Sequence, residues 1–378
     1  MTPPGVWARG GVAPRADGTG EDRATPMAEM PHKLSTSRWT RGGPPGAVMA
    51  LVLGIATLLA LAPDAPAQRT KAGGAPPVKD DLRALIAGAQ SWGYQLQNVE
   101  AKALDATTYD VLVVDAGSGD GKWGLSRDDI RRLKSKPDGS RRIVLAYINI
   151  GEAEDYRYYW QKAWDKTPPA WMGAENCRWR GDHRVRHWAP EWQRLIFGSP
   201  TSYLARLVDA GYDGAWLDRV DIFYYWRGER WQAADDMVRF VTALSAWAKA
   251  RREGFLIVPQ NGEELLSDRR YRAAIDAQGK EDMLLGDRGN DVRNTEARIG
   301  RAKRNMAPLL AEGRPVLAVE YARRKDLLPA IEAELRALGL RPYFGPRSLA
   351  YLGFDGTTHK EDGDTEPTAA DAGDESCE

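Results

Sequence analysis

The sequence predicts an α/β protein built as one (β/α)8 TIM-barrel domain. Eight short runs of mainly apolar residues recur along the chain, and segments with helical spacing of apolar residues separate them. Alternation of strand and helix is typical of a parallel sheet that helices cover. Eight such units within roughly 270 residues fit a closed barrel better than an open sheet. No G-x-G-x-x-G turn follows the first run, which argues against a dinucleotide-binding fold.

Each predicted strand is a short run bounded by polar or turn-forming residues. The run VLVVD at 111–115 is apolar up to its final aspartate, as expected of a strand that is buried on both faces. The eight expected strands are residues 92–97, 111–115, 143–150, 214–218, 255–259, 274–277, 315–320 and 341–344.

The segments between these strands carry apolar residues at i, i+3 and i+4, which places them on one face of a helix. Ser126, with Asp129 three residues later, has the pattern of a capping box and predicts a helix that runs through Leu133. Further helices are expected over residues 191–210, 232–252, 292–312 and 325–338.

Residues 1–67 predict an N-terminal extension that ends in a secretory signal peptide. The apolar run at 47–61 follows basic residues and precedes Ala65-Pro66-Ala67, a pattern that predicts cleavage near 67/68. A membrane anchor is the alternative, but this run is short for a span of about 20 residues. We therefore expect a secreted, periplasmic or cell-envelope protein without stable membrane insertion after cleavage.

Two further segments are expected to be disordered. Residues 68–79 form a linker rich in Pro, Gly and Ala, and residues 356–378 form a polar, acidic tail. Neither segment carries enough large apolar side chains to build a packed core. The barrel is therefore expected over residues 80–355.

Composition excludes some classes of partner and cofactor. The chain has 53 Lys and Arg against 53 Asp and Glu, which gives no reason to expect nucleic acid as a partner. None of its four His lies at a predicted strand end, and no C-x-x-C pair suggests zinc. We predict no metal or other cofactor, with an all-oxygen calcium or magnesium site as an open alternative. Cys377 lies in the acidic tail, so no structural disulfide with Cys177 is expected.

Polar side chains gather where the predicted strands end. In a (β/α)8 barrel these ends meet at one mouth, where active sites lie. A single carboxylate there can simply cap the next helix. Several carboxylates that converge repel one another and raise their pKa values, a cost that indicates use. The candidates are Gln95, Gln97, Asp115, Tyr147, Asn149, Glu152, Glu154, Asp218, Asp221, Gln260, Asn261, Glu281, Asp282, Glu320 and Tyr321.

Paired carboxylates with amide and aromatic neighbours are the groups that glycosidases use. One carboxyl protonates the leaving oxygen, and the other attacks the anomeric carbon or activates water. Segment 156–192 is rich in Trp and Tyr, whose faces stack on sugar rings. It predicts either one wall of a binding groove or a small core that packs on the barrel. No Ser-His-Asp order or G-x-S-x-G turn is present.

Four of these segments also form a recognisable pattern. They are LAYINIGEAEDYRYYW at 145–160, GYDGAWLDRVD at 211–221, PQNGE at 259–263 and the step Lys280-Glu281-Asp282. Together they resemble the signature of glycoside hydrolase family 114, the endo-α-1,4-polygalactosaminidases, and related extracellular TIM-barrel proteins. The resemblance spans about residues 90–350. It implies a (β/α)8 fold and hydrolysis of α-1,4-linked galactosamine-rich polymers.

The resemblance also implies a catalytic Asp at the end of the fourth strand and a catalytic Glu after the sixth. These positions are Asp218, as nucleophile or stabilising carboxylate, and Glu281, as general acid/base. Asp221 competes with Asp218, but strand alternation from the buried GAWL run favours Asp218. The residues expected to bind and orient sugar are Trp92, Asp115, Tyr147, Asn149, Glu152, Asp221, Asn261, Glu320 and Tyr321.

The predicted function is therefore a secreted glycoside hydrolase that cuts within an α-1,4-linked galactosamine-rich exopolysaccharide, with the polysaccharide as its partner. An N-acetylated polymer is an alternative substrate. A non-catalytic carbohydrate-binding barrel of the cell envelope is the alternative function, since the same groove would hold polymer without cutting it. A lyase or a divalent-metal hydrolase on the same fold is a third hypothesis, which inhibition by a chelator would favour.

Overall fold

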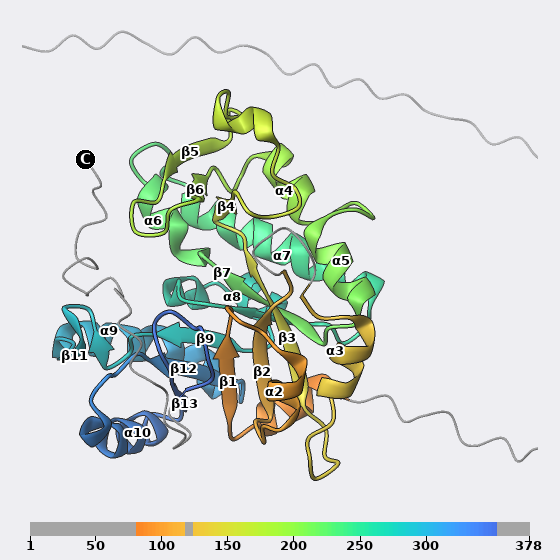
Figure 1. Ribbon diagram of the computed structural model, residues 1–378. Coiled ribbons are helices and arrows are strands. Elements are labelled where there is room, and N and C mark those ends of the chain that lie inside the picture. The colour runs from red at the N-terminus through yellow and green to blue at the C-terminus, as the bar shows by residue number, and fades with distance from the viewer. Residues whose placement is uncertain (1–80, 118–123, 354–378) are drawn as a thin grey trace, which may run out of the picture. The chain divides into compact units, whose positions relative to one another are not determined.

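Parallel strands form the centre of the structure, and helices surround them (Figure 1). The computed structural model describes residues 81–117 and 124–353. The predicted signal peptide, linker and acidic tail lie outside the described residues. Within the described part of the chain, no helix combines the length and the apolar character that a membrane span requires.

Eight strands, all running parallel to their neighbours, make up two sheets. The five-stranded sheet has the order β1 (Trp92–Gln95), β2 (Val111–Asp115), β3 (Ile143–Asn149), β7 (Gly214–Asp218) and β8 (Leu256–Pro259). The three-stranded sheet has the order β13 (Arg341–Phe344), β12 (Val316–Glu320) and β9 (Gln278–Glu281). A parallel bridge between Gln260 and Gly279 joins β8 to β9. The order around the centre is thus that of a (β/α)8 protein, which confirms the predicted fold class.

Side chains make the contact between the last strand and the first. Trp92 Nε1 on β1 donates to the Arg341 carbonyl at 2.8 Å, and Tyr343 Oη on β13 donates to the Tyr94 carbonyl at 3.1 Å. The described residues therefore form two sheets that meet at this seam, rather than one continuous ladder of paired strands.

Helices follow the strands as their apolar spacing predicts. The capping box at Ser126 is present, because Ser126 and Asp129 bond each other's backbone N–H groups at the start of α3. The helices are α1 (Leu82–Gly88), α2 (Ala101–Asp105), α3 (Arg127–Leu133), α4 (Pro190–Ile196), α5 (Tyr203–Ala210), α6 (Phe223–Trp226), α7 (Ala233–Arg251), α8 (Arg269–Ala274), α9 (Glu296–Ala311) and α10 (Leu328–Ala337). Short 3-10 turns are η1 (Lys162–Asp165), η2 (Val220–Ile222), η3 (Glu263–Ser267) and η4 (Lys325–Leu327).

The predicted helix over 191–210 is wrong as a single element, because the chain forms α4 and α5 instead. Gly198, in the interval, has a φ of 95°, which lies in the left-handed region. Pro200 follows and lacks the N–H that would continue a helical ladder. These two residues separate the helices.

The sixth predicted strand at 274–277 is also wrong. Ala274 ends α8, and the strand that joins the sheet is β9, with the sequence QGKE. Gln278 and Lys280 are buried, and both side chains have polar partners. The Gln278 amide nitrogen bonds two backbone carbonyls, and Lys280 Nζ lies 3.5 Å from a carboxylate oxygen of Glu263. Buried polar residues with partners of this kind hide the strand from an apolar pattern.

Aromatic side chains fill the space that the strands enclose. Trp92 and Trp216 stack with ring centroids 5.3 Å apart, and Tyr94 and Tyr343 pack beside them. Gly279 on β9 leaves room for the Trp216 ring, because a Cβ atom at this position would lie only 2.4 Å from Trp216 Cζ2. A second core of aliphatic and aromatic residues lies between the strands and the helices. The residues that the strands enclose form an inner core, which is the floor of the barrel below the residues at the strand ends.

Segment 152–185 adds a small antiparallel sheet after β3. Its strands are β4 (Glu152–Glu154), β6 (Asp182–Val185) and β5 (Met172–Glu175), in that order. Figure 1 shows this small sheet beyond the ends of the central strands. Most aromatic residues of the predicted wall form a small core here, where Trp171 packs on Trp192 and Trp164. A further antiparallel pair, β10 (Leu285–Gly286) and β11 (Gly289–Arg293), follows β9.

The expectation about cysteine is wrong, because Cys177, in the turn between β5 and β6, is disulfide-bonded. The only other cysteine of the sequence, Cys377, lies outside the described residues.

Candidate active site

A pocket of about 840 Å³ lies at the C-terminal ends of the parallel strands. This is the end of a parallel barrel at which active sites form. Most of the predicted site residues line it. They are Asp115, Tyr147, Asn149, Glu152, Asp218, Asp221, Asn261, Glu281 and Tyr321.

Asp218 ends β7 and has a dense shell of hydrogen-bond donors. Tyr147 Oη donates to its Oδ2 at 2.7 Å, and the Arg219 backbone N–H and Gln260 Nε2 donate to its Oδ1 at 2.7 and 2.8 Å. Burial and the neighbouring Glu281 carboxylate raise the pKa of Asp218 to about 7. A shift of this kind, caused by burial and a specific charged neighbour in a pocket, is common at functional sites.

Glu281 ends β9 and faces the same amide. Gln260 Nε2 and Asn261 Nδ2 donate to its Oε2 at 2.7 and 2.9 Å, and Tyr321 Oη donates to its Oε1. Burial raises the pKa of Glu281, and the adjacent Asp282 carboxylate raises it further. A carboxyl with a raised pKa keeps its proton to higher pH than a free glutamic acid, which suits a general acid.

The backbone is strained next to each of these strand-end groups. Arg219, Asn261 and Asp282 have φ values of 56°, 58° and 50°, and they directly follow Asp218, Gln260 and Glu281. A non-glycine residue costs roughly 1 kcal/mol or more in this region, and such residues concentrate at functional sites. The coincidence of strain with three strand ends marks the centre of the site.

A buried ion-pair network lies beside this centre. Arg157 donates to both carboxylate oxygens of Asp115, at 2.6 and 2.8 Å, and to both oxygens of Glu154, at 2.7 and 3.0 Å. Its guanidinium also lies 5.9 Å from the centre of the Tyr147 ring. Because Asp115 is fully engaged by Arg157, it contributes a fixed pocket wall and supports Tyr147.

The small antiparallel sheet contributes a second group of acids. Glu152 accepts from Asn176 Nδ2 at 3.0 Å and lies 3.3 Å from an Arg219 nitrogen. Asp182 also lines the pocket, where burial and then the Glu154 and Glu152 carboxylates raise its pKa to about 9. Asn149 Oδ1 holds this turn by accepting from the backbone of Gly151 and Glu152.

We expect Asp182→Asn to stabilise the folded protein at pH 8. The raised pKa means that folded Asp182 binds a proton at this pH while the unfolded side chain has lost it, so stability falls as pH rises from about 4 to about 9. Asparagine does not titrate, so the variant should gain at least about 1 kcal/mol in the free energy of unfolding at pH 8 and nothing near pH 4. Urea unfolding at both values measures this. Asp155→Asn, an exposed carboxylate nearby, is the control; an equal gain from it would refute the explanation.

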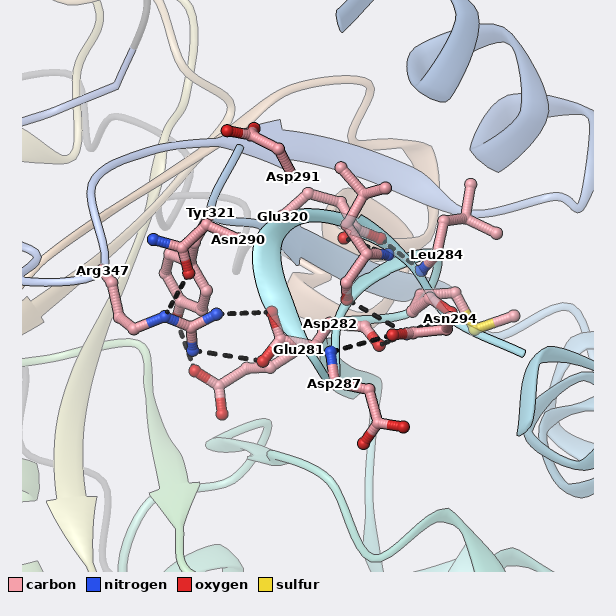
Figure 2. Close-up of polar contacts among 12 residues, drawn as sticks. Glu281, Asp282, Leu284, Asp287, Asn290, Asp291, Asn294, Glu320, Tyr321 and Arg347 are labelled. Atoms are coloured by element: carbon pink, nitrogen blue, oxygen red, sulfur yellow. Dashed lines mark hydrogen bonds and ion pairs between the residues drawn. The ribbon is translucent and has the colours of Figure 1, made fainter. Parts of the chain in front are cut away.

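Two predicted sugar contacts do not belong to the pocket. Trp92 is 1% exposed and lies in the inner core, where its indole nitrogen bonds Arg341. Glu320 is fully buried and accepts from the backbone N–H groups of Leu284 and Leu285 at 2.7 and 3.1 Å. This placement corrects both expectations: Trp92 supports the floor of the site, and Glu320 anchors the turn after β9 (Figure 2).

Figure 2 shows how that turn is fixed around Glu281. Asn294 Nδ2 bonds three backbone carbonyls of the turn, at Asp282, Met283 and Leu285. Arg347 pairs with both oxygens of Asp282 at 2.9 and 3.1 Å and lies 4.4 Å from the centre of the Tyr321 ring. These contacts fix the backbone turn that directly follows Glu281, while Gln260, Asn261 and Tyr321 bond the Glu281 side chain itself.

Asp221 lines the same pocket as Asp218 and Glu281. It lies on η2, beyond the end of β7, with its carboxylate 3.9 Å from an Arg219 nitrogen. Asp218 is the carboxylate at the strand end itself, which supports the choice between them. Among the described residues, no group of three or more His, Cys, Asp or Glu side chains is arranged to hold a metal ion.

Sequence reasoning missed several residues of the site. Gln260 was visible as a polar strand end, but its bond to both carboxylates was not. Tyr94, Arg157, Asp182 and Arg347 carried no usable signal. Tyr94 lies inside a strand, Asp182 begins β6 of the added sheet, and Arg157 and Arg347 lie in loops, so that only the tertiary structure places them at the pocket.

Comparison with known proteins agrees with this architecture. The family model of glycoside-hydrolase family GH114 matches residues 65–365. An uncharacterized protein of Deinococcus radiodurans is 34% identical over 282 residues, which are 73% of this chain and 86% of that protein. An uncharacterized protein of Methanocaldococcus jannaschii is 34% identical over 240 residues, which are 61% of this chain and 66%, just under two thirds, of that protein.

A solved structure has the same fold. The glycoside hydrolase domain of PelA from Pseudomonas aeruginosa superposes with a TM-score of 0.54 at 21% identity, covering 70% of this chain and 98% of that one. The match to the family model extends over most of the chain and includes all the strand ends that line the pocket. On these grounds the chain belongs to glycoside-hydrolase family GH114.

Proposed function

We propose that this protein hydrolyses glycosidic bonds within an exported polysaccharide rich in α-1,4-linked galactosamine. The observation that carries the proposal is the pair Asp218 and Glu281, which stand at the ends of β7 and β9 on either side of β8, line one pocket and share a single amide donor. Both have raised pKa values, which suits one to attack as a carboxylate and the other to donate a proton.

The spacing of the pair favours a retaining mechanism. Gln260 Nε2 lies 2.8 Å from Asp218 Oδ1 and 2.7 Å from Glu281 Oε2. These two oxygens are therefore at most about 5.5 Å apart, close to the 5–5.5 Å of retaining glycosidases and below the 6.5–9.5 Å of inverting ones.

In the proposed reaction, Glu281 protonates the glycosidic oxygen while Asp218 attacks the anomeric carbon, so that the bond to the leaving sugar breaks and a glycosyl ester forms. Glu281, now ionised, then takes a proton from water. The water oxygen bonds to the anomeric carbon and the ester to Asp218 breaks. The released reducing end keeps its α configuration.

The acidic side chains of the pocket support an amine-bearing substrate. Eight of them line it with five arginines, and the raised pKa values of Asp182, Asp218 and Glu281 bring the two kinds of charge close to balance. Individual carboxylates that face the pocket, and not a net negative charge, would therefore bind the ammonium groups of partly deacetylated galactosamine polymers. The family resemblance points to the same polymer, and export through the predicted signal peptide would bring the enzyme to it.

Trp179 is proposed to extend the site along the polymer. Its side chain is 45% exposed, lies in the turn between β5 and β6, and lines the pocket. An exposed indole at a pocket edge can stack on a sugar ring for about 1–2 kcal/mol. We expect Trp179→Ala to raise KM for long chains about tenfold and to leave short oligomers nearly unaffected. Trp231→Ala, at a Trp that is 83% exposed and outside the pocket lining, is the matched control. An equal loss on short and long substrates would contradict this role.

Incubation of the full chain with a panel of exopolysaccharides tests the function. The panel includes partly deacetylated galactosaminogalactan, its fully N-acetylated form and a neutral galactan, and products are measured by reducing ends and mass. We expect internal cleavage at galactosamine. Cleavage of another member would overturn the substrate, and binding of polymer without any new reducing end would favour a non-catalytic carbohydrate-binding barrel.

A further inference from the structure

Gln260 occupies the point between the two proposed reacting carboxylates. Its side chain is buried, and its amide group uses every direction in which it can bond. Nε2 donates one hydrogen to Asp218 and one to Glu281, as described above. Oε1 accepts from Trp216 Nε1 at 2.7 Å and from Tyr94 Oη at 3.1 Å. The amide therefore links the aromatic floor of the barrel to the reacting pair.

The orientation of this amide is dictated by Trp216. An indole N–H can only donate, so it must face the amide oxygen and not the amide nitrogen. The Trp216 ring cannot turn away, because it is fully buried between Trp92 and the bare Cα of Gly279. A reversed amide would set its oxygen against two carboxylates and its nitrogen against two donors. The inner core thus fixes an N–H donor toward each carboxylate.

This arrangement saturates the inner oxygen of each carboxylate. Asp218 Oδ1 accepts from Gln260 and from the Arg219 backbone, and Glu281 Oε2 accepts from Gln260 and Asn261. A proton on either inner oxygen would face two N–H groups. It must therefore reside on an outer oxygen, either Asp218 Oδ2 beside Tyr147 or Glu281 Oε1 beside Tyr321. The two carboxyls cannot share one proton directly, as the pair in aspartic proteases does.

We propose that Gln260 is a positioning residue that fixes the separation of Asp218 and Glu281 and keeps the transferable proton on an outer oxygen of the pair. The inference rests on the proposed function for its catalytic meaning, while its effect on the two carboxyls holds for the protein whatever it cleaves. Gln260 bonds the inner oxygens of the two carboxyls and acts through them.

The first test does not depend on activity. Carboxyl carbons of Asp and Glu are labelled with ¹³C in the full chain and titrated by NMR, with Asp218→Asn and Glu281→Gln used to assign the signals. Gln260→Met keeps the volume but removes the donor that favours the ionised carboxylates. We expect the apparent pKa values of the pair to rise by about one unit or more. Gln260→Glu adds a third carboxylate, and the rise should be larger still.

Gln95→Met is the matched control. Gln95 is also buried at a strand end, but its amide nitrogen bonds only the backbone carbonyls of Gln97, Asn98 and Ala350. It should lower thermal stability as Gln260→Met does and leave the titration of the pair unchanged. If Gln260→Met does not fold, the comparison of Gln260→Glu with the wild type decides.

The second test is kinetic, on the polymer that the wild type cleaves. Gln260→Met should lower kcat about 100-fold, change KM less than about threefold, and move the acidic limb of the pH profile upward by about one unit. Folded variants whose carboxyl titration and pH profile match the wild type would overturn the proposal. If the wild type cleaves nothing in the panel, the proposed function fails, and the NMR titration still decides whether Gln260 controls the pair.

Discussion

Asp218→Asn is expected to lower kcat on the polymer by at least about 10³-fold, because an amide cannot form the glycosyl ester that a carboxylate forms. The loss should appear in kcat more than in KM, since the substituted group reacts with the substrate but contributes little to holding its remote sugars. Reducing-end assays on the folded variant measure the effect. Circular dichroism should show an unchanged fold, because asparagine can still accept from the Arg219 backbone N–H and from Gln260.

Asp221→Asn is the informative comparison for this prediction. Asp221 lies in the same pocket three residues later, but on η2, beyond the end of β7. We expect a loss of about tenfold or less, mainly through KM, as for a residue that orients substrate. A larger loss from Asp221→Asn than from Asp218→Asn would reverse the assignment of the strand-end carboxylate.

Glu281→Gln is expected to lower kcat by about 10²–10⁴-fold on the natural polymer, since proton donation to the leaving oxygen contributes about this much. On an aryl glycoside whose phenolate leaves without a proton, the first chemical step should lose far less. This dependence on the leaving group separates a general acid from a residue that only supports the fold. Equal losses on the two substrates would contradict the role of Glu281.

The pH dependence of activity is a second test of the roles proposed for Asp218 and Glu281. Activity requires Asp218 ionised, so the acidic limb should fall as this group takes up a proton, at a pH above that of a free aspartic acid because burial raises its pKa. Activity also requires Glu281 protonated, so the alkaline limb should fall as pH rises through its raised pKa. In Glu281→Gln the alkaline limb should disappear. A variant profile that keeps this limb would assign it to another group.

The strands that the sequence predicts best are those whose apolar residues are buried on both faces. VLVVD and GAWLD match β2 and β7 at both ends, because nothing polar interrupts them before the final aspartate. The strand QGKE was not predicted, because its buried Gln278 and Lys280 are polar and have partners that come from elsewhere in the fold. A strand that is stabilised by tertiary polar contacts carries no apolar signature of its own.

The residues of the candidate site also differ in how well the sequence predicts them. Asp218, Asn261 and Tyr321 were found because each stands at or directly after a predicted strand end, which topology brings to one mouth. Glu281 was expected a few residues beyond a sixth strand that was placed too early, and the family resemblance singled it out. Glu320 stands at a strand end too, yet it bonds the turn after β9, because a strand end can face inward or toward the next connection. Arg157 and Arg347 approach from loops, and their pairing with Asp115 and Asp282 follows from packing that no local pattern expresses.

Aromatic content was a weaker guide than position. The Trp and Tyr residues of segment 156–192 mostly bury one another, while Tyr156 and Trp179 line the pocket. Both alternatives held for different members of the segment. An amphipathic ring can serve either purpose, so only its exposure at the pocket edge assigns it to the substrate.

The most direct test of the whole account is the anomeric configuration of the first product, followed by ¹H NMR during early cleavage of partly deacetylated galactosaminogalactan by the full chain. The account predicts that α reducing ends appear first and then convert to the α/β equilibrium, and that Asp218→Asn gives no signal above background. Initial release of β reducing ends, or undiminished cleavage by Asp218→Asn, would contradict a mechanism in which Asp218 attacks and Glu281 donates.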